Sequence, residues 1–176
     1  MQHCGLSGLF TDGFPYLNQC YDIWQTLFPK LLPRLSSHVA KQLLGFLGME
    51  EKEFKEMIKA GDPSRTMLSA MYTTYWFQTM MVGGDNPAPS AMAPRLMDSL
   101  LLDGHLGVVF QCGLALLKTR QSELLKLKGD QLAEALRTLP TKAGHGFALD
   151  VLLEKAFEFS VPEKLVLPSD TSGGRL

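Results

Sequence analysis

Two nearly continuous apolar stretches dominate the pattern of the chain. In the first, 71–82, only three threonines and one glutamine are polar, and in the second, 106–117, the one clearly polar side chain is Gln111. A loop rich in glycine and proline, 83–94, follows the first stretch. A helix that is apolar on all sides is one that other helices surround. The pattern therefore predicts two buried helices at the centre of a helical core.

An amphipathic stripe ahead of these stretches predicts a pair of helices. Apolar residues recur three and four positions apart, as on one face of a helix, at Leu17, Cys20, Tyr21, Trp24, Leu27 and Phe28. Pro15 suits the first turn of this helix. Pro29 and Pro33 are expected to end it, because proline lacks an N–H and clashes with the preceding turn. A second helix is expected from about Pro33, with an apolar face made by Leu35, Val39, Leu43, Phe46 and Leu47.

The charged run 50–60 predicts a helix on the surface. Glu51 and Lys55 stand four positions apart and can pair on one face of that helix. The apolar strip beside them is narrow and consists of Phe54, Met57 and Ile58. We interpret the run as a solvated surface helix, with a charged docking face as the alternative. Asp62 is expected to cap the next helix, with Pro63 at its first position.

The rest of the pattern is also helical. Pro94 lies where a helix begins, and Arg95 and Asp98 are expected to pair on its surface. Gly104 and Gly107 break the chain before the second apolar stretch. Further helices are expected at 121–128, at 130–139 and along the stripe Leu149, Leu152, Leu153, Ala156 and Phe157, with 140–146 as a linker. No alternating run bounded by turns is present, so the predicted fold class is all-α.

Length and composition favour one globular domain. The chain has 176 residues, of which 45% are hydrophobic and 20% charged, which is enough to bury a core. We expect an irregular segment at 1–13, a helical domain at 14–140, a linker and final helix at 141–170, and a disordered tail at 171–176. The net charge of −1 gives no reason to expect nucleic acid or an anionic membrane as partner.

Cysteine usage and hydropathy favour a soluble cytoplasmic protein. Cys4, Cys20 and Cys112 are too few and too scattered for a disulfide framework, and no two of them have metal-ligand spacing. The most apolar window, 100–117, contains an aspartate, a histidine and several glycines, whereas a bilayer span needs roughly 20 mostly apolar residues. The start of the chain, 1–10, lacks the pattern of a signal peptide. We therefore expect no membrane insertion.

No motif for catalysis is present. The sequence holds no nucleophile elbow, no phosphate-binding P-loop and no H-E-x-x-H zinc motif, and its four histidines lie far apart. Asp98, Asp103 and His105 could form an acid/base set only together with a nucleophile and an orienting partner. Helix-cap and turn roles are the better interpretation of Asp103 and His105. The Met and aromatic residues of 71–81 are interpreted as core, with a ligand pocket as the alternative. We expect no metal and no cofactor.

The order and spacing of several short motifs resemble one known family. The pieces are Gly13-Phe14-Pro15-x-Leu17, Leu31-x-Pro33-x-Leu35-x-x-His38-Val39, Tyr75-Trp76-Phe77-x-Thr79, Arg95-Leu96-Met97-Asp98, Asp103-Gly104, Val109-Phe110 and Leu114-Ala115-Leu116-Leu117-Lys118. Over about 8–140 they are similar to the C-terminal half of a TBC domain, the catalytic domain of activators of Rab GTPases. The resemblance implies a multi-helix orthogonal array and a Rab-type small GTPase as partner. It marks these family-motif residues, with structural roles: Phe14, Pro15, Pro33, Trp76, Phe77, Arg95, Asp98, Gly104 and Phe110.

The resemblance also implies which catalytic groups are missing. TBC domains use an arginine in an I-x-x-D-x-x-R motif and a glutamine in a Y-x-Q motif, and an arginine supplied in trans is worth roughly 10³–10⁵ in rate. Both motifs lie in the N-terminal half of the family's domain. Asp62 and Arg65 give D-x-x-R, but Lys59 stands where isoleucine belongs, and Tyr-x-x-Gln at 16–19 and 75–78 has the wrong spacing. The resemblance therefore assigns no catalytic residue to this chain.

Two functions follow from the resemblance. The first is a fragment of a Rab GTPase-activating protein that lacks the catalytic arginine and glutamine, which are called fingers because they insert into the GTPase site. Such a fragment binds a Rab protein or forms part of a longer activator, which acts in vesicle trafficking, peripheral to endomembranes. The alternative is a non-catalytic helical scaffold or interaction module, and an unrelated helical protein is a third interpretation. Because a half-domain cut through its core exposes apolar surface, we expect self-association through a face near Leu17, Tyr21 and Trp24.

Overall fold

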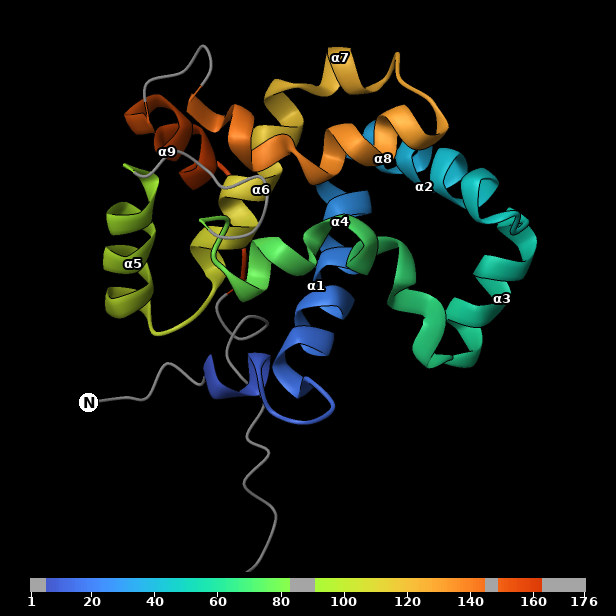
Figure 1. The fold of residues 1–176 in the computed structure, drawn as a ribbon, viewed down its shortest axis with the longest axis horizontal. Coiled ribbons are helices and arrows are strands. Elements are labelled where there is room, and N and C mark those ends of the chain that lie inside the picture. The colour runs from blue at the N-terminus through green and yellow to red at the C-terminus, as the bar shows by residue number, and fades with distance from the viewer. Residues whose placement is uncertain (1–5, 83–90, 145–148, 163–176) are drawn as a thin grey trace, which may run out of the picture.

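The computed structural model describes residues 6–82, 91–144 and 149–162, and this part of the chain is helical without a strand (Figure 1). The prediction of an all-α fold is confirmed. The α-helices are α1 (Pro15–Leu31), α2 (Pro33–Leu47), α3 (Glu51–Ala60), α4 (Met67–Gln78), α5 (Met92–Asp103), α6 (Gly107–Thr119), α7 (Gln121–Leu124), α8 (Gly129–Arg137) and α9 (Leu149–Phe157). The 3-10 helices are η1 (Leu6–Leu9), η2 (Pro63–Thr66) and η3 (Leu139–Gly144). The tail predicted at 171–176 lies outside the described residues.

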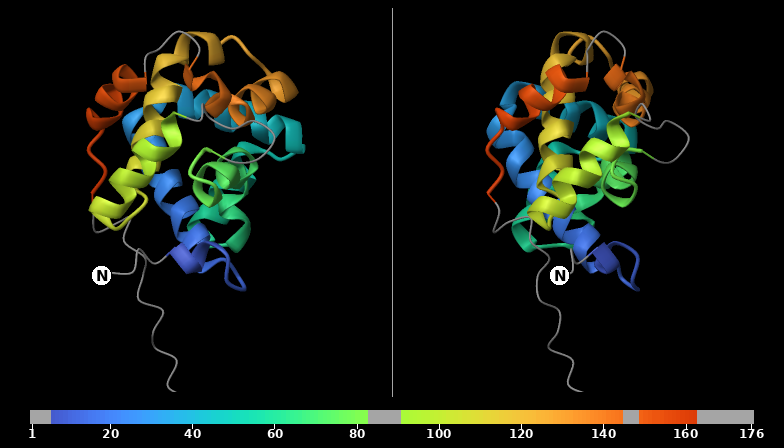
Figure 2. Two further views of the ribbon diagram at one scale, coloured as in Figure 1. Left: turned by 60° about the vertical axis from the view of Figure 1, so that its left-hand side comes forward. Right: turned by 90° about the vertical axis from the view of Figure 1, so that its left-hand side faces the viewer.

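Helices α1, α4 and α6 form the centre of the fold. Helix α1 packs against α2 and α4, and α4 also contacts α6. Figures 1 and 2 show α5 and α9 on one side of α6 and α2 and α3 on the other. As a result, every residue of 106–117 except the half-buried Gln111 is buried. The prediction of a buried helix at the second apolar stretch is confirmed.

Helix α4 departs from the prediction for 71–82. It ends at Gln78, and Met80 and Met81 after it adopt positive φ angles of 50° and 63°. The side chain of Tyr75 is 53% exposed. The expectation that other helices surround this one is therefore wrong. The apolar composition of 71–82 does not show that the face of α4 that carries Tyr75 lies at the surface.

The junction of α1 and α2 shows which proline ends a helix. Pro29 lies inside α1, and helical hydrogen bonding continues past it, since the Leu32 N–H donates to Phe28 O at 2.9 Å. The prediction that Pro29 ends the helix is wrong, because a proline in the last turn removes one bond while buried neighbours hold the turn in place. Pro33 is the first residue of α2, and Leu32 before it has non-helical angles (φ −132°, ψ 61°). The prediction for Pro33 is confirmed.

The face of α1 that was expected to be exposed lies in the core. Leu17 is 4% exposed, Tyr21 is 6% exposed and Trp24 is fully buried. Helices α4 and α6 cover this face: Trp24 Nε1 donates to Tyr72 OH at 2.8 Å, and the ring centres of Trp24 and Phe110 lie 6.2 Å apart. The expectation of an open apolar face here is wrong, because helices later in the same chain supply enough apolar surface to close the core.

The charged run and the cap after it form as predicted. It folds into α3, in which Nζ of Lys55 lies 2.6 Å from Oε1 of Glu51. The Ser64 N–H donates to Asp62 Oδ1 at 2.7 Å, so Asp62 caps η2, which leads into α4. Within α3, all of which the structure describes, Phe54 is the single buried side chain. Helix α3 is therefore a surface helix with a narrow attachment to the core.

The C-terminal elements differ from the prediction in their lengths. The helix expected at 121–128 is the single turn α7, and η3 occupies much of the linker expected at 140–146. Helix α9 packs against α6, with Leu152 and Ala156 buried, whereas Phe157 of the predicted stripe is 59% exposed. None of the described helices is both long and apolar enough to cross a membrane.

Candidate functional site

Three of the family-motif residues meet in an aromatic cluster at the centre of the core. Trp76 and Phe77 of α4 and Phe110 of α6 are at most 1% exposed. The ring centres of Phe77 and Phe110 lie 4.7 Å apart, and Trp24 of α1 stands edge-on to Trp76, at 5.6 Å and 87°. Aromatic pairs in such geometries stabilise a core beyond the area that they bury. The cluster joins the three central helices.

Two tyrosine hydroxyls form polar links inside this apolar centre. Tyr72 OH accepts the hydrogen bond from Trp24 Nε1, and Tyr21 OH lies 2.7 Å from Thr74 Oγ1. Burial raises the pKa of Tyr72 and of Tyr21 above the ordinary value, so both stay protonated at neutral pH. These hydroxyls can donate hydrogen bonds, but they do not act as bases. The sequence carries no signal for these pairs, because their partners lie far apart along the chain.

Phe14, Pro15 and Pro33 mark helix starts. Pro15 and Pro33 are the first residues of α1 and α2, where a missing N–H costs nothing. Phe14 precedes α1 in a left-handed conformation (φ 46°, ψ 52°) and is 45% exposed. The amide of Asn18 donates to Gly13 O at 2.7 Å and fastens this turn. These residues fix how the two helices begin and bring no reactive side chain to a common site.

The motif residues of α5 serve a contact with α9 and a helix end. Nη2 of Arg95 lies 3.4 Å from Oδ1 of Asp150, and the expected pair of Arg95 with Asp98 is not what the structure shows. That expectation is corrected because α9 brings a carboxylate within reach of the same guanidinium. Both partners are more than half exposed, at 57% and 75%, so the ion pair contributes little to stability. Gly104, at φ 72°, ends α5.

The residues considered as an acid/base set do not gather into one. Nδ1 of His105 accepts a hydrogen bond from the Gly107 N–H at 3.0 Å, which confirms the turn role expected of this histidine. Asp98 and Asp103 are exposed on α5. Across the described ranges, no three His, Cys, Asp or Glu side chains come close enough together to hold a metal ion.

Arg65, the arginine of the D-x-x-R sequence, is bound on several sides. Its Nε lies 3.1 Å from Oδ1 of Asp22 and its Nη2 lies 2.9 Å from Oδ2, so the guanidinium holds this carboxylate at two points. Nη1 donates to the carbonyl oxygens of Gly61 at 2.9 Å and Asp62 at 3.2 Å. Two-point arginine–carboxylate pairs are among the stronger charged hydrogen bonds. Arg65 therefore fastens the connection between α3 and α4 to α1. Sequence reasoning missed Asp22 because no local pattern connects it with Arg65, which lies 43 positions further along the chain.

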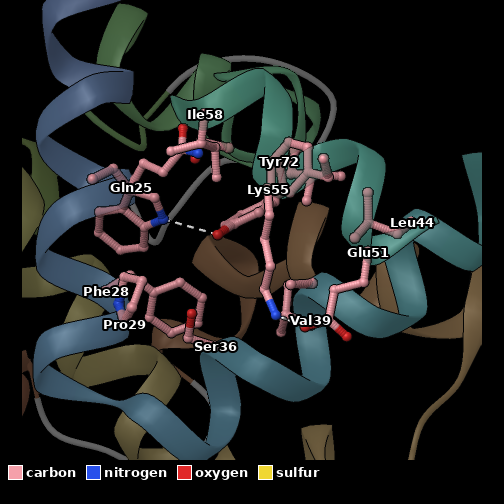
Figure 3. Close-up of a pocket in the computed structure, with 15 residues that line it drawn as sticks. Gln25, Phe28, Pro29, Ser36, Val39, Leu44, Glu51, Lys55, Ile58 and Tyr72 are labelled. Atoms are coloured by element: carbon pink, nitrogen blue, oxygen red, sulfur yellow. Dashed lines mark hydrogen bonds and ion pairs between the residues drawn. The ribbon is translucent and has the colours of Figure 1, made fainter. Parts of the chain in front are cut away.

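A hollow lies between α1, α2, α3 and α4 (Figure 3). Its volume is about 220 Å³, and aromatic and aliphatic side chains from all four helices form most of its wall. The wall also carries two charged residues, Glu51 and Lys55, and the polar groups of Trp24, Gln25, Ser36, Ser69 and Tyr72. Of the stretch 71–81, Tyr72 alone lines this hollow, while Trp76 and Phe77 are core residues. The interpretation of that stretch as core therefore holds for its tryptophan and phenylalanine, and Tyr72 contributes to a pocket.

The described helices pack around one hydrophobic core and form an all-helical domain. The sequence matches the family model described as the Rab-GTPase-TBC domain over residues 1–125. Because the match covers well over half of the chain, the protein belongs to this family. The matched segment contains α1 to α7 and the whole aromatic cluster, whereas α8, η3 and α9 follow it. No solved structure matches the chain.

Proposed function

We propose that this chain binds a Rab-type small GTPase and supplies neither the arginine nor the glutamine that accelerates GTP hydrolysis. Membership of the Rab-GTPase-TBC family supports the class of partner. The sequence supports the second part, since it lacks both I-x-x-D-x-x-R and Y-x-Q. The observation that carries the proposal is that the guanidinium of Arg65 is hydrogen-bonded within the chain. Arg65 is the one arginine in a partial match to the arginine motif.

A catalytic arginine must bring its guanidinium to the transferring phosphate. In Arg65 all three guanidinium nitrogens donate hydrogen bonds within the chain, and the side chain is 28% exposed. Withdrawing it leaves the Asp22 carboxylate without its partner, and a hydrogen bond to a charged group is worth about 1.5–3 kcal/mol. Asp62 is equally engaged, because it caps η2. The D-x-x-R residues of this chain thus serve the fold.

The chain can act in two ways under this proposal. In the first, it is a piece of a longer activator, another part of which inserts the catalytic residues while this part holds the GTPase. In the second, which is the alternative function, it is a non-catalytic helical scaffold or interaction module. The closed core favours the second, since Leu17, Tyr21 and Trp24 need no further helix to cover them.

We further propose that the protein acts in the cytoplasm, in vesicle trafficking, at the surface of endomembranes. In this proposal the chain reaches the membrane through the Rab protein that it binds. The described helices contain no span of their own, so attachment from the side through a partner is the consistent arrangement.

Single-turnover GTP hydrolysis by a panel of Rab proteins, with and without the chain, tests the proposal, and a pull-down with the GTP-loaded proteins measures binding in parallel. We expect binding to at least one Rab protein with no change in its hydrolysis rate. Faster GTP hydrolysis that disappears in Arg65→Ala, but persists in the surface control Arg137→Ala, would show that Arg65 acts as the catalytic arginine and would contradict the proposal. No binding to any Rab protein would leave the scaffold function.

A further inference from the structure

We propose that the end of the molecule at which α1 and α6 finish binds the anionic surface of a membrane. This basic end consists of two stretches that lie against each other, 26–42 and 115–130. The contact is direct and adds to the attachment through a GTPase proposed above. Its test contains no GTPase, so the two proposals can fail separately.

The fold brings the two stretches to one end. Helices α1 and α6 begin together, because the Leu106 N–H donates to Tyr16 OH at 3.4 Å, and the aromatic cluster joins the two helices further along. Both helices therefore finish at the opposite end, where α2 and α7 start. There Nε2 of His38 in α2 lies 2.9 Å from the carbonyl oxygen of Leu127, and α2 packs against α8. In Figures 1 and 2 this end lies at the top, around α7.

Positive charge is concentrated in the basic end. The two stretches together hold seven basic and two acidic residues, which gives them a net charge of +5. Since the whole chain carries −1, its remaining residues sum to −6. A molecule with this distribution turns its positive end toward an anionic surface, because the rest of it is repelled. The acidic residues are Glu123 and Asp130, and the basic residues are Lys30, Arg34, Lys41, Lys118, Arg120, Lys126 and Lys128.

Most of this positive charge is available to a partner. Two cations are partly offset: Nη1 of Arg120 lies 3.3 Å from Oε2 of Glu123, and Lys41 acts on Glu51 of α3. Lys55 and, more weakly, Lys41 lower the pKa of the Glu51 carboxyl. The other five cations are exposed, and none of them forms an ion pair with another described side chain. These five are Lys30, Arg34, Lys118, Lys126 and Lys128.

Two of the five cations stand where a helix favours the opposite charge. Arg34 is the second residue of α2, and Lys128 is the N-cap residue of α8. The positive end of the helix dipole lies at these positions, so a carboxylate is favourable there and a cation is not. Lys30 and Lys118, in contrast, lie in the last turns of α1 and α6, where the dipole favours them. Helix stability therefore does not account for Arg34 and Lys128, whereas an anionic partner does.

The chemistry of the basic end favours a membrane over a protein or a nucleic acid. The cores of protein interfaces are apolar and depleted in lysine, whereas none of the large apolar side chains of these two stretches is exposed. Single-stranded nucleic acids stack their bases on aromatic rings, and the one phenylalanine here, Phe28, is buried. Four of the five exposed cations are lysines, which act as point charges. Clusters of about four to eight lysines and arginines are typical of contacts with anionic lipids.

Co-sedimentation with phosphatidylcholine vesicles, with and without phosphatidylserine, tests the proposal. We expect the chain to bind only the vesicles that contain phosphatidylserine. Binding should be lost as salt rises from about 0.1 M to about 1 M, since the Debye length falls from about 10 Å to about 3 Å. Arg34→Gln combined with Lys128→Gln should weaken binding about 25-fold, about fivefold for each charge. Because both substitutions remove an unfavourable charge from a helix start, the double variant should keep its circular dichroism spectrum.

Lys52→Gln combined with Lys59→Gln is the matched control. It removes the same charge from exposed positions on α3, which Figure 1 shows away from the basic end, and should leave binding nearly unchanged. Absence of binding to phosphatidylserine vesicles would overturn the proposal, as would an equal loss of binding in the two double variants. Equal binding to neutral vesicles would contradict an electrostatic contact. Tighter binding to a duplex DNA oligonucleotide than to the vesicles, at the same salt, would assign the basic end to nucleic acid instead.

Discussion

Replacing Gly113 with alanine tests how the aromatic centre packs against α6. A Cβ atom at this position would lie 2.9 Å from Cζ3 of Trp76 and 3.1 Å from Cη2 of Trp24. Carbon atoms in contact prefer separations of about 3.5–4.0 Å. The added methyl group therefore requires both indole rings to shift by several tenths of an ångström. Neither ring can do so freely, because both are fully enclosed and Trp24 is also bonded to Tyr72.

Two opposing effects determine the size of the change. Alanine is favoured over glycine inside a helix by about 1 kcal/mol, whereas overpacking of a close-packed core typically costs about 1–3 kcal/mol. With two rigid rings in the way, we expect Gly113→Ala to lower the free energy of unfolding by about 1–2 kcal/mol. Gly45 in α2 provides the matched control, since a Cβ there meets nothing within 4 Å. Gly45→Ala should raise the free energy of unfolding by about 0.5–1 kcal/mol.

Urea unfolding, followed by tryptophan fluorescence and by circular dichroism, measures both variants. A change in midpoint at constant slope reports a change in stability. We expect the midpoint of Gly113→Ala to fall and that of Gly45→Ala to rise. If Gly113→Ala stabilises the protein as much as Gly45→Ala does, the two indole rings do not pack against α6 as described here.

Two further predictions concern the Arg65 contact and the buried thiols. Arg65→Ala should lower the free energy of unfolding by about 1–2 kcal/mol, at the lower end for charged hydrogen bonds because Asp22 is 45% exposed; a double-mutant cycle with Asp22→Ala that gives no coupling would contradict the contact. Burial raises the pKa of the Cys112 thiol to about 12 and also raises that of Cys20. In a Cys4→Ser background, neither thiol should therefore react with a disulfide reagent until the chain unfolds. Rapid reaction of the native protein would refute their burial. Because the thiols ionise first in the unfolded chain, stability should fall as pH rises above about 8.5.

The sequence predicts helices well where one periodic face is buried. The stripe of α1 follows from spacing, and so does that of α2 at Leu35, Val39 and Leu43. Phe46 and Leu47, which were expected on the same face of α2, are 55% and 41% exposed, so this part of the prediction is wrong. The burial of α6 follows from its continuous apolar composition. Spacing does not show which helix supplies that partner. Trp24 bonds to Tyr72, 48 positions away, and lies near Phe110 of α6, and the packing of the helices that carry these partners buries the α1 stripe. Local rules also fail to show that Tyr75 stays at the surface.

The candidate sites were less predictable than the helices. Order and spacing identified Trp76, Phe77 and Phe110 as motif residues, and the structure brings all three into the core. The ion pair of Arg95 depends on where α9 packs, so proximity in sequence pointed to the wrong carboxylate. The hollow beside Gln25 remains where the surfaces of four helices do not pack together completely, and the pattern along a single helix does not predict it.

The core of this protein extends beyond the segment that matches the family. Helix α9, which follows that segment, packs on α6, and Gln111 Nε2 of α6 donates to Phe159 O at 3.0 Å. On the other side of the core, His38 Nε2 donates to Leu127 O at 2.9 Å, and α2 packs against α8. Elements after residue 125 therefore cover both α6 and α2. Experiments on the proposed GTPase complex therefore need a chain that includes α8 and α9.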